Sequence, residues 1–169
     1  QKLLNTSIEG TIKKFYYNGY NYQNVTVDGS MKMPYYKGYF NSNDPNLKMD
    51  FDGVIDLSNK ASNYDFKAQI DYADLYVLNF YRKDSLAIFK GNINFKAIGN
   101  SIDDLAGKLE IHDVSYQNSK DFYFFDDFEI NSTFDENNIR TIAINSPDII
   151  SGEVVGKYKV KEVRKIVEN

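Results

Sequence analysis

The chain has no cysteine and no tryptophan, and only one histidine and three prolines among its 169 residues. Without cysteine, disulfides and thiolate metal sites are excluded, but the compartment stays open because oxidising and reducing locations both tolerate such a chain. No apolar run approaches about 18 residues, so no stretch is expected to cross a membrane as a helix. The net charge is −4 and no basic stripe is visible, which argues against nucleic-acid binding.

What the chain does have is alternation of apolar and polar residues in many short runs. It is clearest in residues 47–52, 66–70 and 128–131. Period-two patterning is typical of strands with one apolar and one polar face. The aromatic content of 15%, from 14 tyrosines and 12 phenylalanines, also suits strands.

The runs recur without a βαβ rhythm, which predicts about eleven strands in an antiparallel all-β meander. We expect one domain over residues 1–169. A bulge or bend is expected at Gly53. Two strand arms are expected around Gly91, and a short helical turn is expected within residues 71–80. Asn18-Gly19 is a strong hairpin-turn dipeptide. From Val160 onward the apolar spacing changes to that of a helix, so a short C-terminal helix is expected.

No catalytic, metal or cofactor site is predicted. The one histidine, His112, faces water by its phase in a strand. The carboxylate pairs 103–104 and 126–127 are adjacent, and adjacent strand residues point to opposite faces, so neither pair converges on a cleft. Asp50-Phe51-Asp52-Gly53 is only a fragment of a calcium loop, and the glycines are scattered rather than gathered in a phosphate-binding loop.

The remaining candidate site is the apolar face of the predicted sheet. Composition alone favours a closed core, in which a second sheet or barrel wall covers this face. The other interpretation is an incompletely closed sheet whose face forms a groove for acyl chains. The candidate lipid-contact residues are Phe51, Ile55, Phe66, Ile70, Ile93, Phe95, Leu109, Ile111, Phe128, Ile130, Ile142, Ile144 and Tyr158.

Several segments also resemble a known family. Residues 20–29 (YNYQNVTVDG) resemble a recurrent strand-and-turn unit of the AsmA-like/TamB proteins of Gram-negative bacteria, and residues 43–57 and 99–109 resemble its continuation. Residues 124–128 and 144–152 are similar to TamB-type chains of Bacteroidetes in particular. The resemblance runs from about Ile8 to Val167, and its motifs are degenerate.

This resemblance implies a fold, a place and partners. Such proteins are long, anchored at the inner membrane and extended across the periplasm, with a curled antiparallel sheet, the β-taco, that forms an open trough. They are implicated in moving phospholipid toward the outer membrane, and TamB proteins partner an Omp85-type outer-membrane barrel. This chain, which begins at Gln1, would then be an internal segment of the trough. The family supplies no catalytic residues, and cut sheet edges would favour self-association.

Two rival functions stay open. The first is a closed β-sandwich binding module for carbohydrate or a protein ligand, which would use exposed tyrosines such as Tyr16, Tyr17, Tyr35 and Tyr36. The second is a small hydrolase with an unrecognised carboxylate pair.

Overall fold

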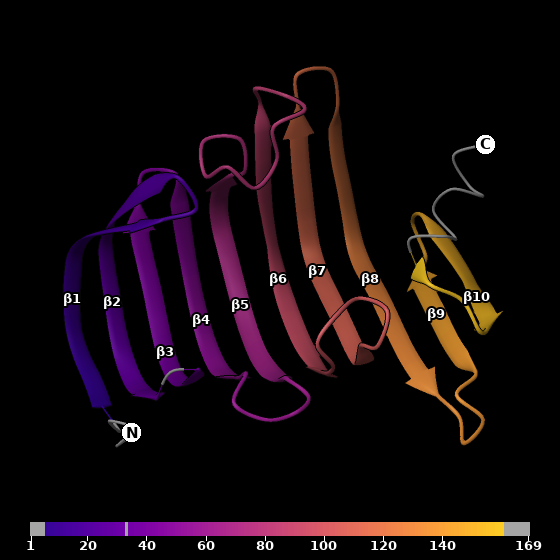
Figure 1. Ribbon diagram of the computed structural model, residues 1–169. Coiled ribbons are helices and arrows are strands. Elements are labelled where there is room, and N and C mark those ends of the chain that lie inside the picture. Colours follow the sequence, from indigo (N-terminus) through magenta and orange to yellow (C-terminus); the bar gives the residue numbers. More distant parts are fainter. Residues whose placement is uncertain (1–5, 33, 161–169) are drawn as a thin grey trace.

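The computed structural model describes residues 6–32 and 34–160, and these form one sheet of ten antiparallel strands in chain order (Figure 1). Each strand pairs only with its neighbours in the sequence. The strands are β1 (Thr6–Tyr17), β2 (Tyr20–Lys32), β3 (Tyr35–Asp44), β4 (Leu47–Asp56), β5 (Asn63–Asp74), β6 (Ala87–Ile98), β7 (Ala106–Asn118), β8 (Phe122–Phe134), β9 (Arg140–Ser146) and β10 (Ile150–Gly156).

The sheet is curved and open. Figure 1 shows β1 and β10 at opposite ends of the array, and the two do not pair. The predicted all-β, antiparallel architecture is therefore confirmed, together with the lack of closure. A closed sandwich needs two sheets packed face to face, and all ten strands belong to one sheet.

Glycine and asparagine place the turns and bulges. Asn18 and Gly19 have φ values of 50° and 79°, the two positive angles that a tight β1–β2 hairpin requires. The sequence predicted two strand arms around Gly91, but Gly91 lies inside the single strand β6. There the β6–β7 register shifts between Lys90 and Asn92. The extra residue of a bulge explains why the alternation breaks there.

Other local predictions need correction. The pairing of β4 runs unbroken through Gly53, and its register shift lies beside Met49 instead. β5 continues through Asp74, so only the later part of the segment 71–80 is a turn. The predicted helix lies outside the described residues apart from Val160, its first residue, and no helix is seen in the part of the chain that the structure describes.

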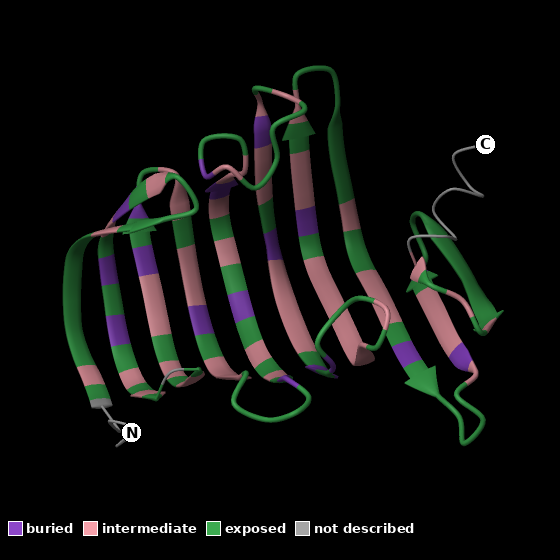
Figure 2. Ribbon diagram, viewed as in Figure 1, coloured by how far each residue is buried: buried purple, intermediate pink, exposed green. Residues whose placement is uncertain are grey.

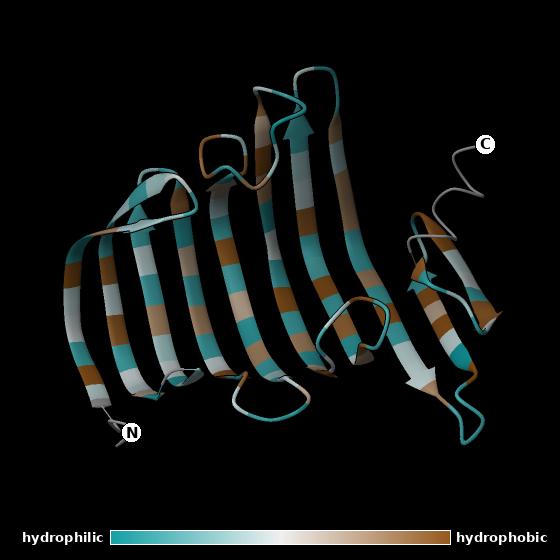
Figure 3. Cartoon of the chain, viewed as in Figure 1, coloured by the Kyte–Doolittle hydropathy of each residue, from teal (hydrophilic) through white to brown (hydrophobic). Residues whose placement is uncertain are grey.

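The two faces of the sheet differ in polarity. Alternating bands of hydrophobic and hydrophilic residues cross the strands (Figure 3). On the polar face, Lys108 bridges Glu110 at 2.8 Å and Glu129 at 3.0 Å, and Lys96 lies 3.1 Å from Asp65. The apolar face carries no second layer among the described residues, and along the strands the buried positions appear as separate bands (Figure 2).

The small buried core lies at one end of the apolar face. Residues 75–86, here called the strap, join β5 to β6, and Leu78 of the strap is packed with Tyr22 and Val25 of β2. The strap also reaches the β1–β2 turn, where the Asn18 side-chain amide donates to the Leu78 backbone carbonyl at 3.2 Å and the Asn79 side-chain amide donates to the Asn18 backbone carbonyl at 2.9 Å. The strap therefore closes this end of the curled sheet.

Candidate functional site

The apolar face is built from cross-strand rows of side chains. Phe66 on β5 pairs with Phe95 on β6, Phe95 with Leu109 on β7, Leu109 with Ile130 on β8, and Ile130 with Ile144 on β9. Antiparallel pairing places directly opposed residues on the same face, so such a row forms a continuous apolar band across the sheet. A neighbouring row runs Phe51, Ala68, Ile93, Ile111 and Phe128.

Aromatic rings are in contact along this face. The centroids of Phe51 and Phe66 lie 5.0 Å apart, and those of Phe66 and Phe95 lie 5.5 Å apart. Tyr64 adds a further contact with Phe95 at 5.6 Å. These separations are in the favourable range for tilted aromatic pairs, so the rings hold one another in place without a covering layer.

All the predicted lining residues within the strands share this face, and none is deeply covered except Phe51. Phe51 is 9% exposed, and the other predicted residues are half-buried. Tyr158 lies beyond the end of β10 rather than in a strand, and its hydroxyl donates to the Val154 carbonyl at 3.1 Å. A closed core would bury such residues, whereas these keep part of their surface exposed.

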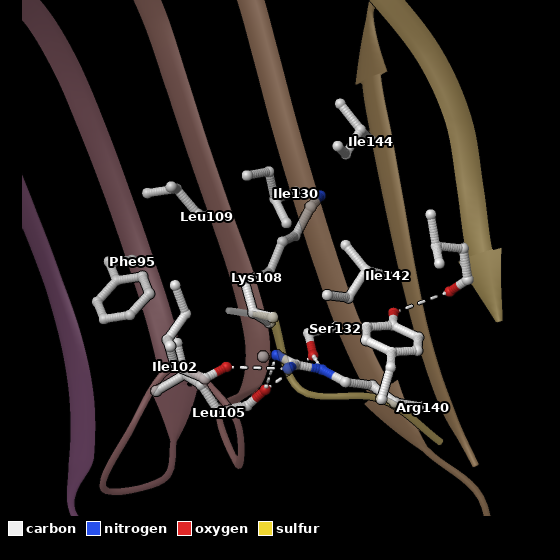
Figure 4. Close-up of a pocket in the computed structure, with 14 residues that line it drawn as sticks. Phe95, Ile102, Leu105, Lys108, Leu109, Ile130, Ser132, Arg140, Ile142 and Ile144 are labelled. Carbon is white, nitrogen blue, oxygen red and sulfur yellow. Dashed lines mark hydrogen bonds between the residues drawn. The ribbon is translucent and has the colours of Figure 1, made fainter. Parts of the chain in front are cut away.

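Three hollows lie along this face. One, of about 380 Å³, contains six of the predicted residues: Phe95, Leu109, Ile130, Ile142, Ile144 and Tyr158 (Figure 4). A second, of about 630 Å³, lies over β1–β4 and contains Phe51 and Ile55. A third, of about 280 Å³, lies under the strap and contains Ile70. Phe66, Ile93, Ile111 and Phe128 line none of these three.

Sequence reasoning missed much of the second hollow. Its further lining residues are Ile12, Phe15, Tyr17, Val27, Met31, Tyr36, Phe40 and Met49. Val27 and Met49 were in phase with predicted strands, so the same alternation could have identified them. Burial among these neighbours raises the pKa of Tyr36 above its ordinary value of 10.0. Phe15, Tyr17, Phe40 and Met49 line the third hollow too, so the second and third hollows adjoin.

Arg140 is the unexpected member of the 380 Å³ hollow. It precedes Ile142 by two residues and so shares its face, yet the residue is only 3% exposed. Its Nε donates to Ser132 Oγ at 3.0 Å, its Nη1 to the Ile102 carbonyl at 2.9 Å and its Nη2 to the Leu105 carbonyl at 3.1 Å. These bonds hold the loop between β6 and β7 over the end of the apolar face (Figure 4).

The chemically reactive candidates lie apart from these hollows. His112 sits on the polar face, as predicted, with its Nδ1 2.6 Å from Asp127 Oδ1. Asp104 accepts hydrogen bonds from Ser101 within its own loop. Among the described residues no cluster of three or more histidines and acids is arranged to hold a metal ion. In the same part of the chain, no helix has the length and apolarity needed to cross a membrane.

The chain matches no protein-family model, no curated protein and no solved structure. The geometry of the apolar face therefore carries the functional argument.

Proposed function

We propose that this chain is a segment of a periplasm-spanning bridge protein of the AsmA-like/TamB type, which carries phospholipid along an apolar groove between the inner and outer membranes. The observation that supports this most is the open apolar face, with half-buried rows of side chains and hollows along it. Figure 2 shows no covering layer over those rows within residues 6–32 and 34–160.

The physical basis is hydrocarbon burial. Each methylene group removed from water contributes about 0.8 kcal/mol, so an acyl chain lying across Leu109, Ile130 and Ile144 gains several kcal/mol. The lipid head group would lie toward an end of the apolar face, because the middle of that face offers it few polar partners. The transport would be passive and the role non-enzymatic, with acyl chains sliding along rows of similar side chains.

The resemblance to AsmA-like/TamB proteins adds the cellular setting to the proposal. The full-length protein would be anchored at the inner membrane, with this segment in the periplasm. It would reach an Omp85-type barrel in the outer membrane and would aid outer-membrane protein assembly as well as, or instead of, lipid transport.

The test is lipid co-purification. Organic extraction of the purified chain followed by mass spectrometry should recover phospholipid. Ile130→Asp and Phe95→Asp place a charge on the apolar face and should abolish that recovery, while circular dichroism still reports β structure. Asn131→Asp is the matched control, because it adds the same charge to β8 at an exposed position on the opposite face.

Two outcomes would contradict the proposal. One is a wild-type extract free of lipid together with binding to a glycan array, which would favour a carbohydrate-binding module. The other is equal lipid recovery from Ile130→Asp and Asn131→Asp, which would show that the apolar face does not hold the lipid.

A further inference from the structure

The buried guanidinium of Arg140 has no anionic partner in the described part of the chain. An arginine side chain stays positively charged at every pH at which proteins are folded. Its hydrogen-bond acceptors are the Ser132 hydroxyl and the carbonyl groups of Ile102, Asp103 and Leu105. No carboxylate of the described residues forms an ion pair with it.

The nearest acidic residue of the loop is already engaged elsewhere. The Asp103 carboxylate accepts a hydrogen bond from the Val160 amide at 2.8 Å, while only the Asp103 backbone carbonyl faces Arg140, at 3.4 Å. That contact is long for a hydrogen bond. Each of the three guanidinium nitrogens has an oxygen acceptor, but all of these acceptors are neutral and leave the positive charge without a counter-ion among the described residues.

Beyond its oxygen acceptors, this cation is bordered by hydrocarbon. The Phe134 ring lies 5.3 Å from the guanidinium carbon, and Ile142 and Ile130 line the hollow that begins at Arg140 (Figure 4). A charge held away from water without a counter-ion is unfavourable, and the attraction for an anion is stronger in an apolar setting than in water. The hollow thus combines one fixed positive charge with an apolar lining.

We propose that this hollow is a subsite for the anionic end of an amphiphile. A carboxylate or phosphate group would lie against Arg140, and its hydrocarbon chain would run over Ile142, Ile130 and Ile144. The hollow of about 380 Å³ accommodates about a dozen methylene-sized groups at the volume of about 30 Å³ that a water molecule occupies. This inference rests on the proposed function, and adds which end of the ligand binds where.

The test compares head groups at constant chain length by isothermal titration calorimetry. The probes are dodecanoate, dodecyl phosphate, neutral dodecanol and inorganic phosphate, each below its aggregation concentration. A charge-assisted hydrogen bond in an apolar site favours the two charged amphiphiles over dodecanol by about tenfold or more in affinity. Inorganic phosphate should bind far more weakly than dodecyl phosphate, because it lacks the chain.

Substitutions of Arg140 test whether its positive charge, rather than the shape of its side chain, determines the preference for charged amphiphiles. Arg140→Gln should reduce the affinity for dodecanoate to that for dodecanol, whereas Arg140→Lys should keep part of the preference. Arg82→Gln, which removes an exposed arginine of the strap, should change nothing. A measurement on the wild type avoids dependence on the folding of the variants: the ¹⁵N signal of Arg140 Nε should shift on adding dodecanoate but not dodecanol.

Each contrary result has a distinct meaning. Equal affinities for dodecanoate and dodecanol would overturn the subsite and leave the groove proposal intact. Inorganic phosphate binding as tightly as dodecyl phosphate would show an anion site without a chain site, which also overturns the inference. If the wild type bound none of the amphiphiles, both the subsite and the proposed function would fail.

Discussion

Single residues decide how closely strands β2, β3 and β4 approach one another. Gly29, Gly38 and Gly53 are opposed on β2, β3 and β4. A Cβ on Gly38 would lie 2.3 Å from the Asp28 carbonyl oxygen and 2.4 Å from the Gly29 Cα. These distances are far below van der Waals contact, so a side chain at Gly38 would collide with the backbone of the neighbouring strand.

Gly38→Ala should therefore destabilise the sheet. Its φ of 151° is one that residues with a side chain rarely adopt, and the new methyl group meets backbone that cannot move aside. We expect a loss of about 1–3 kcal/mol in the free energy of unfolding, measured by urea denaturation. Gly152→Ala is the control, since a Cβ there meets nothing within 4 Å. Equal effects of the two substitutions would show that close strand approach is not the reason for glycine.

The limits of sequence reasoning are also visible at single residues. Phe95, Leu109 and Ile130 could be assigned to one face because strand alternation is a local property. Gly91 was misassigned because a turn and a bulge both use glycine, and only the partner strand distinguishes them. Arg140 was missed because its carbonyl acceptors lie more than thirty residues away, and no local pattern indicates that an arginine of a strand will face inward.

Among the elements, the strap is the least predictable and the most constrained by distant contacts. Near β5, Leu78 of the strap packs into the core beside Val25. Near β6, the strap is hydrogen-bonded to the β7–β8 turn. There the Asp84 carboxylate accepts from the Ser119 hydroxyl at 2.6 Å and from the Leu86 amide at 3.0 Å. Only a turn around Tyr72, Leu75, Tyr76 and Leu78 could be expected from the sequence.

Acid should weaken the attachment of the strap. The Ser119 hydroxyl, followed by the amides of Leu86 and Ser119, holds the pKa of Asp84 below its ordinary value of 3.8. A carboxyl with a lowered pKa in the folded state contributes its stability fully above the unfolded value, and that stability is lost as the pH falls through the folded pKa. The Asp84 contribution should therefore be present at neutral pH and disappear as the pH falls below about 4.

The comparison that checks this is the urea midpoint of wild type and Asp84→Asn across that range. The wild type should be the more stable at neutral pH, and the difference should shrink on acidification. Glu153→Gln, on β10 and away from the strap, serves as the control for general loss of negative charge. A difference between wild type and Asp84→Asn that stays constant with pH would contradict the role given to the carboxylate.

On the scale of the whole molecule, the sheet is a one-dimensional array. Strands contact only their sequence neighbours, so stability is approximately a sum of nearest-neighbour terms and does not depend on closure. Such an array can extend along the groove direction without changing its cross-section. Its weak points are its edges, because an edge strand presents unpaired backbone groups.

The two edges differ in how they are protected, which predicts the mode of self-association. β1 carries Lys13 and Lys14, charges that discourage strand addition, whereas β10 has no lysine, carries the single charge of Glu153, and exposes Ile150 and Val155 at 59% and 58%. Pairing of β10 with β10 of a second copy buries the less protected edge of both and leaves only the two lysine-bearing β1 edges exposed. We therefore expect a concentration-dependent dimer and no larger polymer.

Sedimentation velocity over a range of protein concentrations tests this expectation. Val155→Lys, which places a charge on the β10 edge, should shift the equilibrium to monomer, while Gln69→Lys, at an exposed position in the middle of the sheet, should not. Ile130→Asp distinguishes the other available route. If that substitution abolished the dimer and Val155→Lys did not, the copies would be meeting through their apolar faces, and the groove rather than the edge would be the surface that a second copy covers.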